Sequence, residues 1–482
     1  MKVLLVTPPY HSGVVESAGR WMPLGLAYLA GAVRRAGHEV EIYDAMTKFH
    51  GMDEVRARLA ASRPDVIGIT AITASYPAAL RVLAAAKEIL PGVVTVVGGV
   101  HTHFLWREAL EGNPGTVDYV VRGEGEQALP GLLACLAAGG DPRRVAGVAC
   151  RDGATAVAAP LRPLLSGLED TAPAWDLVEW PDYTYFPFPG SRLAAVSTSR
   201  GCSQGCSFCS QRKFWTRAWR GRAPEAVIAE LEHLRDAHGV TVALFADECP
   251  TTDAGRWEAL LRLAVKRRLG LRLLIESRVE DVVRDAPLID LYREAGIIHV
   301  YVGVEATTQA ALDRFNKNLR VDLSAQALRL IAGAGMISET SFVLGMPEET
   351  PDTVAATLKL AREYDPDFAH FLMITPWPYA EIAAELEPYI ESRDFSDYNL
   401  VTPVARSAAM TRSELEAAMV ECYRKFYMGK LPRWASSPAG FRKDYILTSM
   451  RLIMKSSFLR RYMGGLGTMP AEIERFFRAP VP

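Results

Sequence analysis

The sequence predicts an α/β protein with an N-terminal doubly wound, Rossmann-like domain, a partial (β/α)6 barrel and a mostly helical C-terminal region. Short β-rich runs alternate with helical patterns over residues 1–150, and again over residues 191–376. Prolines interrupt the pattern at 151–190, which we expect to be a linker, and residues 377–482 form the C-terminal region. At 482 residues the chain is long enough for two domains and an appendage.

The composition limits the classes of function. Hydrophobic residues make up 49% and charged residues 23% of the chain, which is typical of a globular protein rather than a disordered or fibrous one. The formal net charge of −2 provides no field that would hold a polyanion, so nucleic acid is not expected as a partner. A small or medium-sized substrate is expected instead.

Five parallel strands with helices between them are expected in the first domain. The strands are predicted at Val3–Val6, Val40–Tyr43, Val66–Ile69, Val93–Val97 and Tyr119–Val121. The helices are predicted at Pro23–Ala36, Asp53–Ala61, Tyr76–Leu90 and Glu126–Ala138. A doubly wound sheet of this kind has its ligand crevice at the carboxyl ends of the strands.

Proline shapes the expected linker between Asp152 and Ser191. Because proline fixes φ and removes a backbone donor, a dense set of prolines interrupts any regular element. The prolines in this segment are Pro160, Pro163, Pro173, Pro181, Pro187 and Pro189. We therefore expect an irregular segment that wraps between the two domains.

A second alternating series predicts the barrel, whose functional residues should lie on loops at the strand ends. Its strands are expected at Ala194–Ser197, Val242–Ala246, Leu271–Ile275, His299–Val304, Thr340–Leu344 and Phe368–Leu372. Helices such as Pro224–Ala237 and Trp257–Arg268 accompany them. Beyond Pro378 the chain becomes mostly helical, without repeats or low-complexity tracts.

The N-terminal segment carries no expected targeting signal. It has one basic residue, Lys2, and a short apolar run that stops at Pro8, too short for a signal peptide core. No stretch of the sequence reaches the roughly 18 apolar residues that a membrane-spanning helix needs. We therefore expect a cytoplasmic protein without a transmembrane segment.

The cysteines point to a metal site. Of seven cysteines, Cys202, Cys206 and Cys209 form a CxxxCxxC run directly after the first barrel strand, which suits a metal better than disulfides. Three thiolates can hold three irons of a cubane and leave the fourth iron open. The open iron could chelate the amine and carboxylate of a methionine group. A zinc site is the alternative. Zinc usually has four ligands, however, and the histidine nearest to the three cysteines in the sequence is His233.

This loop resembles that of the radical S-adenosylmethionine (SAM) superfamily, and the likeness covers essentially the whole chain. The resemblance implies a [4Fe-4S] cluster on the three cysteines and a bound SAM. By position, the residues implied in SAM binding are Phe208, Ala246, Asp247, Glu248, Glu276, Ser277, Arg278 and Glu305. Each acidic residue at a strand end has a plainer alternative, because carboxylates there often cap helices or form surface ion pairs.

The first domain lacks a dinucleotide fingerprint, because Thr7 to Tyr10 rather than G-x-G-x-x-G follows the first strand. Glycines instead follow the fourth and fifth strands, where they let a broad ligand approach the backbone. These features resemble the cobalamin-binding domains found in front of radical SAM barrels. The implied cobalamin-binding residues are Tyr10, Thr70, Thr73, Gly98, Gly99, His101, Arg122, Gly123, Glu124 and Gly125.

The cobalt-binding motif D-x-H-x-x-G is absent from the sequence. The resemblance therefore implies cobalamin with its base displaced and its lower face open or met by another residue. Tyr10, His11 and Tyr76 are unranked candidates for that contact, whereas His101 is expected to be a hydrogen-bonding loop residue.

Further segments resemble, more specifically, the anaerobic magnesium-protoporphyrin IX monomethyl ester oxidative cyclases. They include Tyr10–Gly13, Tyr43–Thr47, Cys209–Trp215, Asp313–Lys317, Thr375–Pro378, Asn399–Pro403 and Arg424–Tyr427. The resemblance implies hydrogen abstraction from a porphyrin propionate side chain and closure of a fifth ring, with oxygen from water. It also implies a flavodoxin- or ferredoxin-type electron donor.

Aromatic side chains near the predicted strand ends could stack on a large flat substrate. Trp215, Trp377 and Tyr379 are the expected substrate-pocket residues, with Phe214 and Trp219 close by in the sequence. Core or interface packing is the alternative for each of them. The tail after Tyr427 is brief, which leaves the substrate open.

Two other functions remain open. A cobalamin-dependent radical SAM C-methyltransferase acting on a natural product or lipid would share every cofactor motif. A non-catalytic cobalamin sensor would explain the first domain but leave the three clustered cysteines without a purpose. A methylthiotransferase fits less well, because the first domain has only Cys135 and Cys150 instead of a second set of three cysteines.

Overall fold

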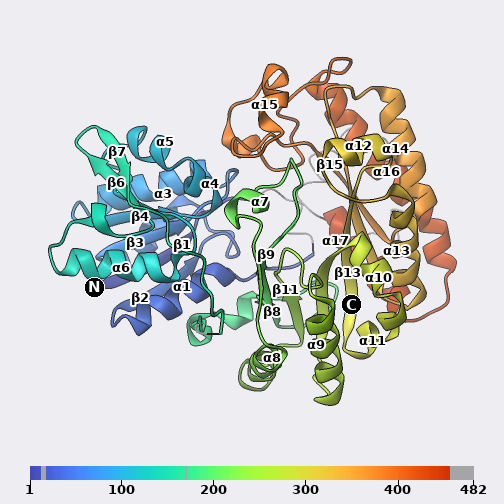
Figure 1. The fold of residues 1–482 in the computed structure, drawn as a ribbon, viewed down its shortest axis with the longest axis horizontal. Helices are drawn as coiled ribbons and strands as arrows, with labels where there is room; N and C mark the ends of the chain where they lie inside the picture. Colours follow the sequence, from blue (N-terminus) through green and yellow to red (C-terminus); the bar gives the residue numbers. More distant parts are fainter. Residues whose placement is uncertain (12–17, 170, 456–482) are drawn as a thin grey trace.

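The computed structural model describes residues 1–11, 18–169 and 171–455, which form two lobes (Figure 1). The N-terminal sheet and its helices make one lobe, and the barrel with the C-terminal helices makes the other. Helix α7 and strand β9 lie on the side of the barrel that faces the N-terminal lobe. The cysteine run between β9 and α7 therefore lies on the side where the two lobes meet.

The N-terminal lobe is built on a seven-stranded sheet of order β2-β1-β3-β4-β5-β6-β7. The first five strands pair in parallel, as predicted. Four of them, β1, β3, β4 and β5, are largely buried runs rich in Val, Ile and Leu, whereas the edge strand β2 leaves Glu39 exposed. Their bounds are β1 Lys2–Thr7, β2 Glu39–Asp44, β3 Val66–Thr70, β4 Val94–Gly98 and β5 Tyr119–Val121. The helices are α1 Leu24–Arg35, α2 Met52–Ser62, α3 Tyr76–Ile89, α4 Val100–Phe104, α5 Trp106–Glu111 and α6 Gly125–Ala137.

An antiparallel hairpin extends this sheet into the segment predicted as a linker. Strand β6 (Val148–Asp152) pairs with β5 and with β7 (Thr155–Ala158). A two-residue loop joins β6 and β7, and its Gly153 adopts φ +63°, which suits such a tight turn. The hairpin went unpredicted because its strands are short and flanked by prolines.

The rest of the expected linker is irregular but packed. Trp175 and Trp180 lie in short 3-10 turns, are buried, and belong to the same hydrophobic cluster as the barrel. The indole N–H of Trp180 donates to the Trp175 carbonyl at 3.1 Å. Tyr183 donates to the buried Asp44 carboxylate at 3.1 Å, so this segment joins the two domains.

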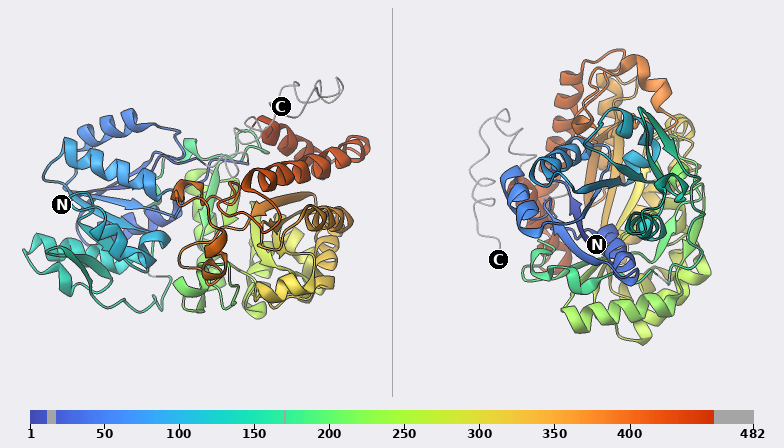
Figure 2. Two further views of the ribbon diagram at one scale, coloured as in Figure 1. Left: turned by 90° about the horizontal axis from the view of Figure 1, so that it is seen from above. Right: turned by 90° about the vertical axis from the view of Figure 1, so that its left-hand side faces the viewer.

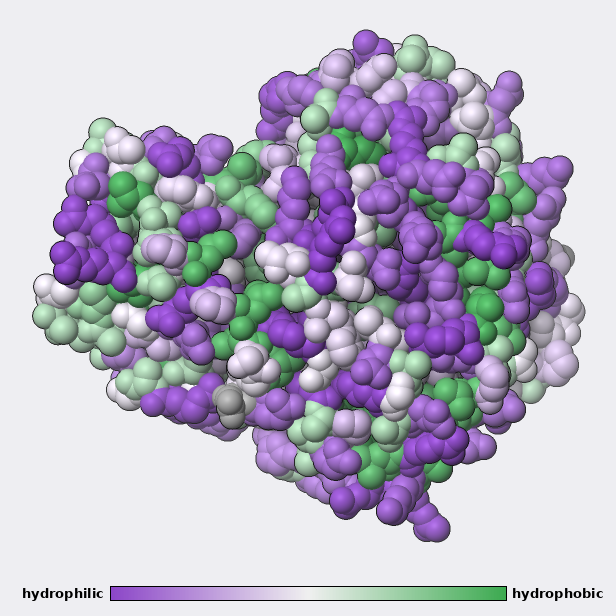
Figure 3. Space-filling model, in the orientation of Figure 1, coloured by the Kyte–Doolittle hydropathy of each residue, from purple (hydrophilic) through white to green (hydrophobic). Residues whose placement is uncertain are grey.

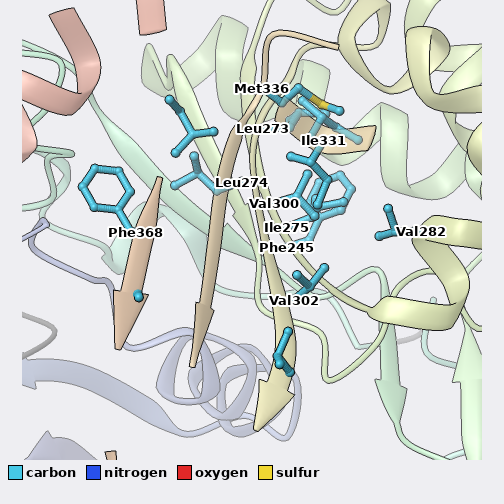
Figure 4. Packing of buried hydrophobic residues seen from close by; sticks show 14 of the residues in the cluster. Phe245, Leu273, Leu274, Ile275, Val282, Val300, Val302, Ile331, Met336 and Phe368 are labelled. Carbon is cyan, nitrogen blue, oxygen red and sulfur yellow. The ribbon is translucent and has the colours of Figure 1, made fainter. Parts of the chain in front are cut away.

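The second lobe contains a six-stranded parallel sheet of order β15-β14-β13-β12-β11-β8, which matches the predicted partial barrel. The strands are β8 Leu193–Val196, β11 Val242–Phe245, β12 Arg272–Arg278, β13 Ile297–Glu305, β14 Ile337–Leu344 and β15 Phe368–Met373. The helices are α8 Pro224–His238, α9 Ala254–Lys266, α10 Val279–Arg284, α11 Ile289–Glu294, α12 Gln309–Arg314, α13 Val321–Gly333 and α14 Pro351–Tyr364. Figure 4 shows Leu273, Ile331 and Met336 packed together in its buried core.

Two short strands absent from the prediction flank the cysteine loop. They are β9 (Ser199–Gly201) and β10 (Trp219–Gly221), which pair antiparallel, with α7 (Gln211–Phe214) between them. Three-residue strands leave almost no periodicity in a sequence. Their pairing nevertheless closes the segment that contains all three clustered cysteines into a loop.

The C-terminal region is helical only in its later part. After α15 (Ala383–Leu386) the chain is largely irregular up to α16 (Arg412–Ser436) and α17 (Phe441–Lys455). Helix α16 packs on β15 and α14, and both long helices cover one side of the barrel (Figure 2). Residues 456–482 of the predicted C-terminal region lie outside the described residues, as do Ser12 and Gly13.

None of the helices in the described part of the chain is long and apolar enough to cross a membrane. Figure 3 shows hydrophilic side chains spread over the visible face, with hydrophobic residues scattered between them.

Candidate active site

A cavity of about 430 Å³ lies between the two lobes, at the carboxyl ends of the N-terminal strands. Thr7 and Thr70 line it from β1 and β3, and glycines line it after β4 and β5. Trp215, Ala246 and Glu248 line it from the barrel. This is the crevice that a doubly wound sheet offers to a ligand, closed here by the cysteine-bearing side of the barrel.

Glycine keeps one wall of this cavity flat. Gly99 has φ +99°, and a Cβ built on it would stand 2.5 Å from the Ala71 carbonyl oxygen. No side chain fits there without moving the backbone. At Gly123 the φ is +77° and the space beside Cα is open. The wall therefore suits a broad ligand that lies against the backbone.

Six of the ten residues implied in cobalamin binding line this cavity. They are Thr70, Gly98, Gly99, Gly123, Glu124 and Gly125. The other four, Tyr10, Thr73, His101 and Arg122, are not among its lining residues. The structure thus brings the glycine-rich loops together and places the remaining candidates elsewhere.

His101 is a buried packing residue. Its ring lies 3.2 Å from the Thr73 hydroxyl through Nδ1 and packs against Tyr76, with centroids 4.2 Å apart. Burial lowers the pKa of His101 to about 4, so the ring is neutral. Tyr10 donates to the Ser396 carbonyl at 3.1 Å, and His11 stacks on Phe49. Neither these residues nor Tyr76 line the cavity.

Ion pairs join the cobalamin-type loop to the hairpin that flanks the cysteines. The Glu124 carboxylate pairs with Arg200 of β9 at 2.8 Å and with Arg220 of β10 at 2.9 Å. Glu126 pairs with Arg200 at 2.6 Å. All four side chains are at most 15% exposed. Arg200 also stacks on Tyr28. The cavity wall and the cysteine loop are therefore held in one arrangement.

The cysteine loop is fixed from the barrel side. The Ser207 N–H donates to the Phe315 carbonyl at 2.9 Å, and the Asn316 amide donates to the Gly205 carbonyl at 2.7 Å. The Ile382 N–H donates to the Ser207 carbonyl at 3.1 Å. Phe208, one of the implied SAM residues, packs edge-on against Phe315. These contacts hold three half-buried thiols on one short loop.

Burial disfavours the thiolate form of Cys202 and Cys209. Burial raises the pKa of Cys209 to about 12 and raises that of Cys202, although the Arg278 guanidinium acts in the opposite direction on Cys202. A bound metal would deprotonate them, because it supplies the positive charge that burial removes. Within the described residues, no three His, Cys, Asp or Glu side chains converge on a single metal-ion position. A lone zinc, with thiolates at about 2.3 Å, finds no preformed site there.

Two adjacent carboxylates after β11 have different surroundings. Asp247 is fully buried and accepts bonds from Thr198 N–H at 2.7 Å and from the Ser199 hydroxyl at 2.6 Å. Its pKa is raised to about 6 by burial, against the effect of these donors. Glu248 lines the cavity and accepts from Gly201 N–H at 2.9 Å and Trp215 Nε1–H at 2.7 Å. Glu248 faces the cavity, whereas Asp247 binds the segment at Thr198 and Ser199.

The other implied SAM residues at the strand ends are held by protein partners. Ser277 shares a hydrogen bond with Thr251 at 2.9 Å, and Arg278 pairs with Glu280 at 2.5 Å. Glu305 adopts φ +65°, a strained conformation for a residue with a side chain. Its carboxylate pairs with the buried Lys317 at 2.8 Å.

A second cavity, of about 630 Å³, lies inside the barrel. It adjoins the first one, because Ala246 and Leu24 line both. Glu276 lines this barrel cavity and its side chain is exposed to it. Its depth in the barrel and the nearby Glu339 carboxylate raise the pKa of Glu276 to about 7. A ligand in the barrel cavity would therefore lie beside a ligand held between the lobes.

Four residues of this cavity that form one polar network, Glu339, His299, His370 and Tyr445, were not predicted as site residues from the sequence. Glu339 of β14 lies between two imidazoles, with its Oε2 2.6 Å from His299 Nε2 and its Oε1 in contact with His370 Nε2. His299 Nδ1 lies 2.7 Å from the Tyr445 hydroxyl of α17. Although burial alone would raise it, the two imidazoles hold the pKa of Glu339 well below its usual range. The sequence does contain one sign of this network, since each of its strand residues is a titratable side chain in or next to a predicted buried strand.

The three aromatic residues expected in the substrate pocket do not line a common cavity. Trp215 lines the cavity between the lobes and bonds to Glu248. Tyr379 is buried where the lobes meet, with its hydroxyl 2.8 Å from that of Thr73 and its ring stacked on Phe104. Trp377 packs near Tyr398. Trp377 and Tyr379 do not line either cavity.

Comparison with known families agrees with this geometry. A family model described as the B12 binding domain matches residues 10–133, and one described as the radical SAM superfamily matches residues 196–361. The first range contains the glycine loops of the cavity between the lobes. The second contains the cysteine loop and most of the strands that enclose the barrel cavity.

Individual proteins extend the match to the whole chain. An anaerobic magnesium-protoporphyrin IX monomethyl ester cyclase of Rubrivivax gelatinosus is 38% identical over 96% of this chain and 84% of its own length. An uncharacterized methyltransferase of Pyrococcus horikoshii is 30% identical over 89% of this chain and 93% of its own. The solved structure of the radical S-adenosylmethionine methyltransferase TsrM from Kitasatospora setae, with tryptophan and a SAM analogue bound, has a TM-score of 0.71 at 19% identity, covering 99% and 97% of the two chains. The chain therefore belongs to the family of the anaerobic magnesium-protoporphyrin IX monomethyl ester cyclases, within the cobalamin-dependent radical SAM enzymes.

Proposed function

We propose that this chain cleaves SAM reductively and uses the resulting radical for oxidative cyclisation of magnesium-protoporphyrin IX monomethyl ester or a related tetrapyrrole. The observation that carries the proposal is the 38% identity to a cyclase over 96% of the chain. Two adjoining cavities support it, because a substrate in the barrel would lie next to the site for cobalamin.

The cysteine loop fits a [4Fe-4S] cluster held by Cys202, Cys206 and Cys209. Three thiols on one fixed loop, with the Arg278 guanidinium near Cys202, match a cluster that keeps one iron open. When bound, this cluster supplies the electron that splits the carbon–sulfur bond of SAM and yields a 5′-deoxyadenosyl radical. Glu248, which faces the cavity beside this loop, is our candidate for the SAM amino group.

The cavity between the lobes fits cobalamin. Its glycine walls at Gly99 and Gly123 and its position at the strand ends suit a broad, flat ligand that lies against the backbone. Histidine is absent from the residues that line it in the described part of the chain. We therefore propose that no histidine of the first domain contacts the lower face of cobalt.

The barrel cavity is our candidate for the substrate site. Its lining is mostly apolar and aromatic, with Trp21, Tyr185, Tyr301 and Phe368 among its residues, as expected for a large flat ligand. Each turnover would also need an electron, for which we propose a flavodoxin- or ferredoxin-type donor.

Anaerobic reconstitution tests the proposal directly. The protein is supplied with iron, sulfide, cobalamin, SAM, a strong reductant and magnesium-protoporphyrin monomethyl ester, and products are followed by mass spectrometry. The proposal expects 5′-deoxyadenosine and a tetrapyrrole with the additional ring and no additional methyl group. Absence of 5′-deoxyadenosine with every acceptor tried would favour a non-catalytic cobalamin sensor.

A C-methyltransferase is the second candidate, favoured by the 30% identity to a methyltransferase over 89% of the chain. In that case the acceptor would be a natural product or lipid. S-adenosylhomocysteine and a product heavier by one methylene would identify this reaction. Both readings use the same cofactor residues, so only the product separates them.

A further inference from the structure

The barrel cavity is lined by two histidines that differ in how they are held. His299 is engaged at both ring nitrogens, with Nδ1 2.7 Å from the Tyr445 hydroxyl and Nε2 2.6 Å from Glu339. His370 contacts the same carboxylate through Nε2, but its Nδ1 has no hydrogen-bond partner among the described residues. The side chain of His299 is 10% exposed and that of His370 is 26% exposed. His299 is therefore fixed by protein, whereas one nitrogen of His370 remains available to a ligand.

The position of His370 in β15 directs its ring into the cavity. Phe368, His370 and Leu372 are alternate residues of this strand, and all three line the cavity. Alternate side chains of a strand lie on the same face, so His370 points inward with its two apolar neighbours. A ligand that fills the cavity would therefore contact the imidazole.

The Glu339 carboxylate determines which nitrogen of His370 can accept a proton. An ionised carboxylate only accepts hydrogen bonds, so the Nε2 atom that contacts it carries a hydrogen. In a neutral ring the lone pair is then on Nδ1. The two imidazoles hold the pKa of Glu339 well below its usual range, so this carboxylate stays ionised. A fixed negative charge next to Nε2–H stabilises the imidazolium that forms when Nδ1 takes up a proton.

The proposed oxidative cyclisation needs such a proton acceptor. A side-chain carbon of the substrate would lose a hydrogen atom to the 5′-deoxyadenosyl radical and an electron to a one-electron acceptor, which leaves a cationic carbon. A water molecule would then bond to this carbon through an electron pair of its oxygen. One O–H bond of that water breaks, its electron pair stays on the oxygen, and the proton must be accepted inside the cavity.

We infer that His370 accepts this proton on Nδ1, while Glu339 faces the resulting imidazolium. The inference rests on the proposed function. Glu276 is another titratable side chain exposed to the cavity. Among the described residues, however, no hydrogen bond fixes its carboxylate, whereas the ring of His370 is already oriented by Glu339. A base that is held in place before the reaction is the more effective one.

The test compares two products of one reaction, 5′-deoxyadenosine and the ring-closed tetrapyrrole, in the anaerobically reconstituted protein. In His370→Ala, 5′-deoxyadenosine should stay within about 2-fold of the wild type, because the radical forms before the proton is lost. The ring-closed product should fall at least ~100-fold, which is typical for the loss of a positioned general base. His233→Ala is the control, because His233 is an exposed histidine of α8 outside both cavities, and it should leave both products unchanged.

Added imidazole separates a proton acceptor from a residue that only packs. His370→Ala removes a side chain from the cavity lining, so free imidazole can take its place and should raise the yield of ring-closed product at least ~10-fold. Pyrazole has nearly the same size and shape but is a much weaker base, so it should restore none of the product. The wild type receives the same additives, which corrects for their binding to the cofactors.

Thermal unfolding of each variant checks that it is folded. If His370→Ala does not fold, His370→Gln replaces it, because an amide can still donate to Glu339 but cannot accept the proton. The ratio of ring-closed product to 5′-deoxyadenosine then decides alone, and the same loss of at least ~100-fold is expected.

The outcomes separate the inference from the proposed function. Ring-closed product at the wild-type level in His370→Ala would overturn the inference and leave the proposed function intact. An equal loss of both products, no rescue by imidazole, or equal rescue by pyrazole would also overturn it. Absence of ring-closed product from the wild type would overturn the proposed function, and the inference with it. Loss of the ring-closed product alone, with rescue by imidazole only, supports both.

Discussion

At the scale of single residues, the three clustered cysteines are held by backbone contacts of their loop rather than by one another. Cys206 follows Gly205, whose carbonyl accepts from Asn316, and precedes Ser207, which bonds to Phe315 and Ile382. We therefore expect the loop to keep its shape when one thiol is removed. This allows a clean test of the role of that thiol.

Cys206→Ala should abolish SAM cleavage, because a cluster held by two cysteines loses the geometry that leaves one iron open to SAM. The measurement is 5′-deoxyadenosine formed by the anaerobically reconstituted protein under strong reduction. Cys135→Ala is the matched control, since Cys135 lies on α6 in the other lobe and should retain full cleavage. Cleavage retained by Cys206→Ala would refute the cluster assignment.

Glu276 also gives a pH-dependent stability prediction. Its pKa is raised to about 7 in the folded protein, mainly by its depth in the barrel and then by Glu339, from an ordinary value of 4.5. The unfolded chain therefore releases this proton at lower pH than the folded one does. Ionisation of Glu276 therefore leaves the free energy of unfolding unchanged below pH 4.5, lowers it as the pH rises to about 7, and keeps it lowered above that pH.

Glu276→Gln should therefore stabilise the protein more at pH 8 than at pH 5. We expect the difference in melting temperature between variant and wild type to grow by on the order of 2 °C. The shift is small because the Glu276 side chain is exposed to the cavity rather than enclosed by protein. Thermal denaturation at several pH values measures it. Glu363→Gln, on the exposed side of α14, should show no such growth.

At the scale of elements, the loop after β4 depends on its glycine. Gly99→Ala should lower the free energy of unfolding by about 2 kcal/mol, since a left-handed φ is unfavourable with a Cβ and the Ala71 carbonyl lies 2.5 Å away. The same change should weaken cobalamin binding, measured by absorption of the reconstituted protein. Gly92→Ala is the control, because a Cβ there has open space and no positive φ. Equal stability of the two variants would contradict this reading of the cavity wall.

The elements also show what the sequence can and cannot predict. The parallel strands of both domains and the cysteine loop were predictable, because short apolar runs such as Val66–Thr70 and the CxxxCxxC spacing are local signals. The hairpin β9–β10 was missed because three-residue strands carry no period. The network of His299, Glu339 and His370 was missed because it forms only when three strands far apart in sequence become neighbours.

Other misplaced residues have the same origin. His101 and Tyr379 sit close to predicted strand ends in the sequence, but their side chains point to partners in other elements, Tyr76 and Phe104. Asp247 and Glu248 are adjacent in sequence, yet only Glu248 faces a cavity. A position near a strand end in the sequence predicts in which part of the fold a residue lies. It does not predict the direction in which the side chain points.

At the scale of the whole molecule, the two lobes are joined by buried charges. Glu124 of the first domain pairs with Arg200 and Arg220 of the second, next to the cysteine loop. The ion pairs thus join the proposed site for cobalamin to the proposed site for the cluster. Relative motion of the lobes would break these pairs and separate the two proposed sites.

Glu124→Ala should therefore destabilise the protein by about 3 kcal/mol, because it leaves two buried guanidinium groups without their shared partner. Chemical denaturation measures the loss. Asp176→Ala is the control, since its pair with Arg34 is exposed and contributes at most about 1 kcal/mol. A loss for Glu124→Ala no larger than that of the control would mean that the lobes are not held by this network.

The central claim is that this chain closes a ring on a tetrapyrrole by radical chemistry, and one measurement tests it most directly. The reconstituted enzyme is incubated without oxygen in water enriched in ¹⁸O, with SAM, reductant and magnesium-protoporphyrin monomethyl ester, and the tetrapyrrole is examined by mass spectrometry. Our account predicts a product that carries one oxygen atom from water and no additional carbon. A product that carries an added methyl group, with release of S-adenosylhomocysteine, would contradict it.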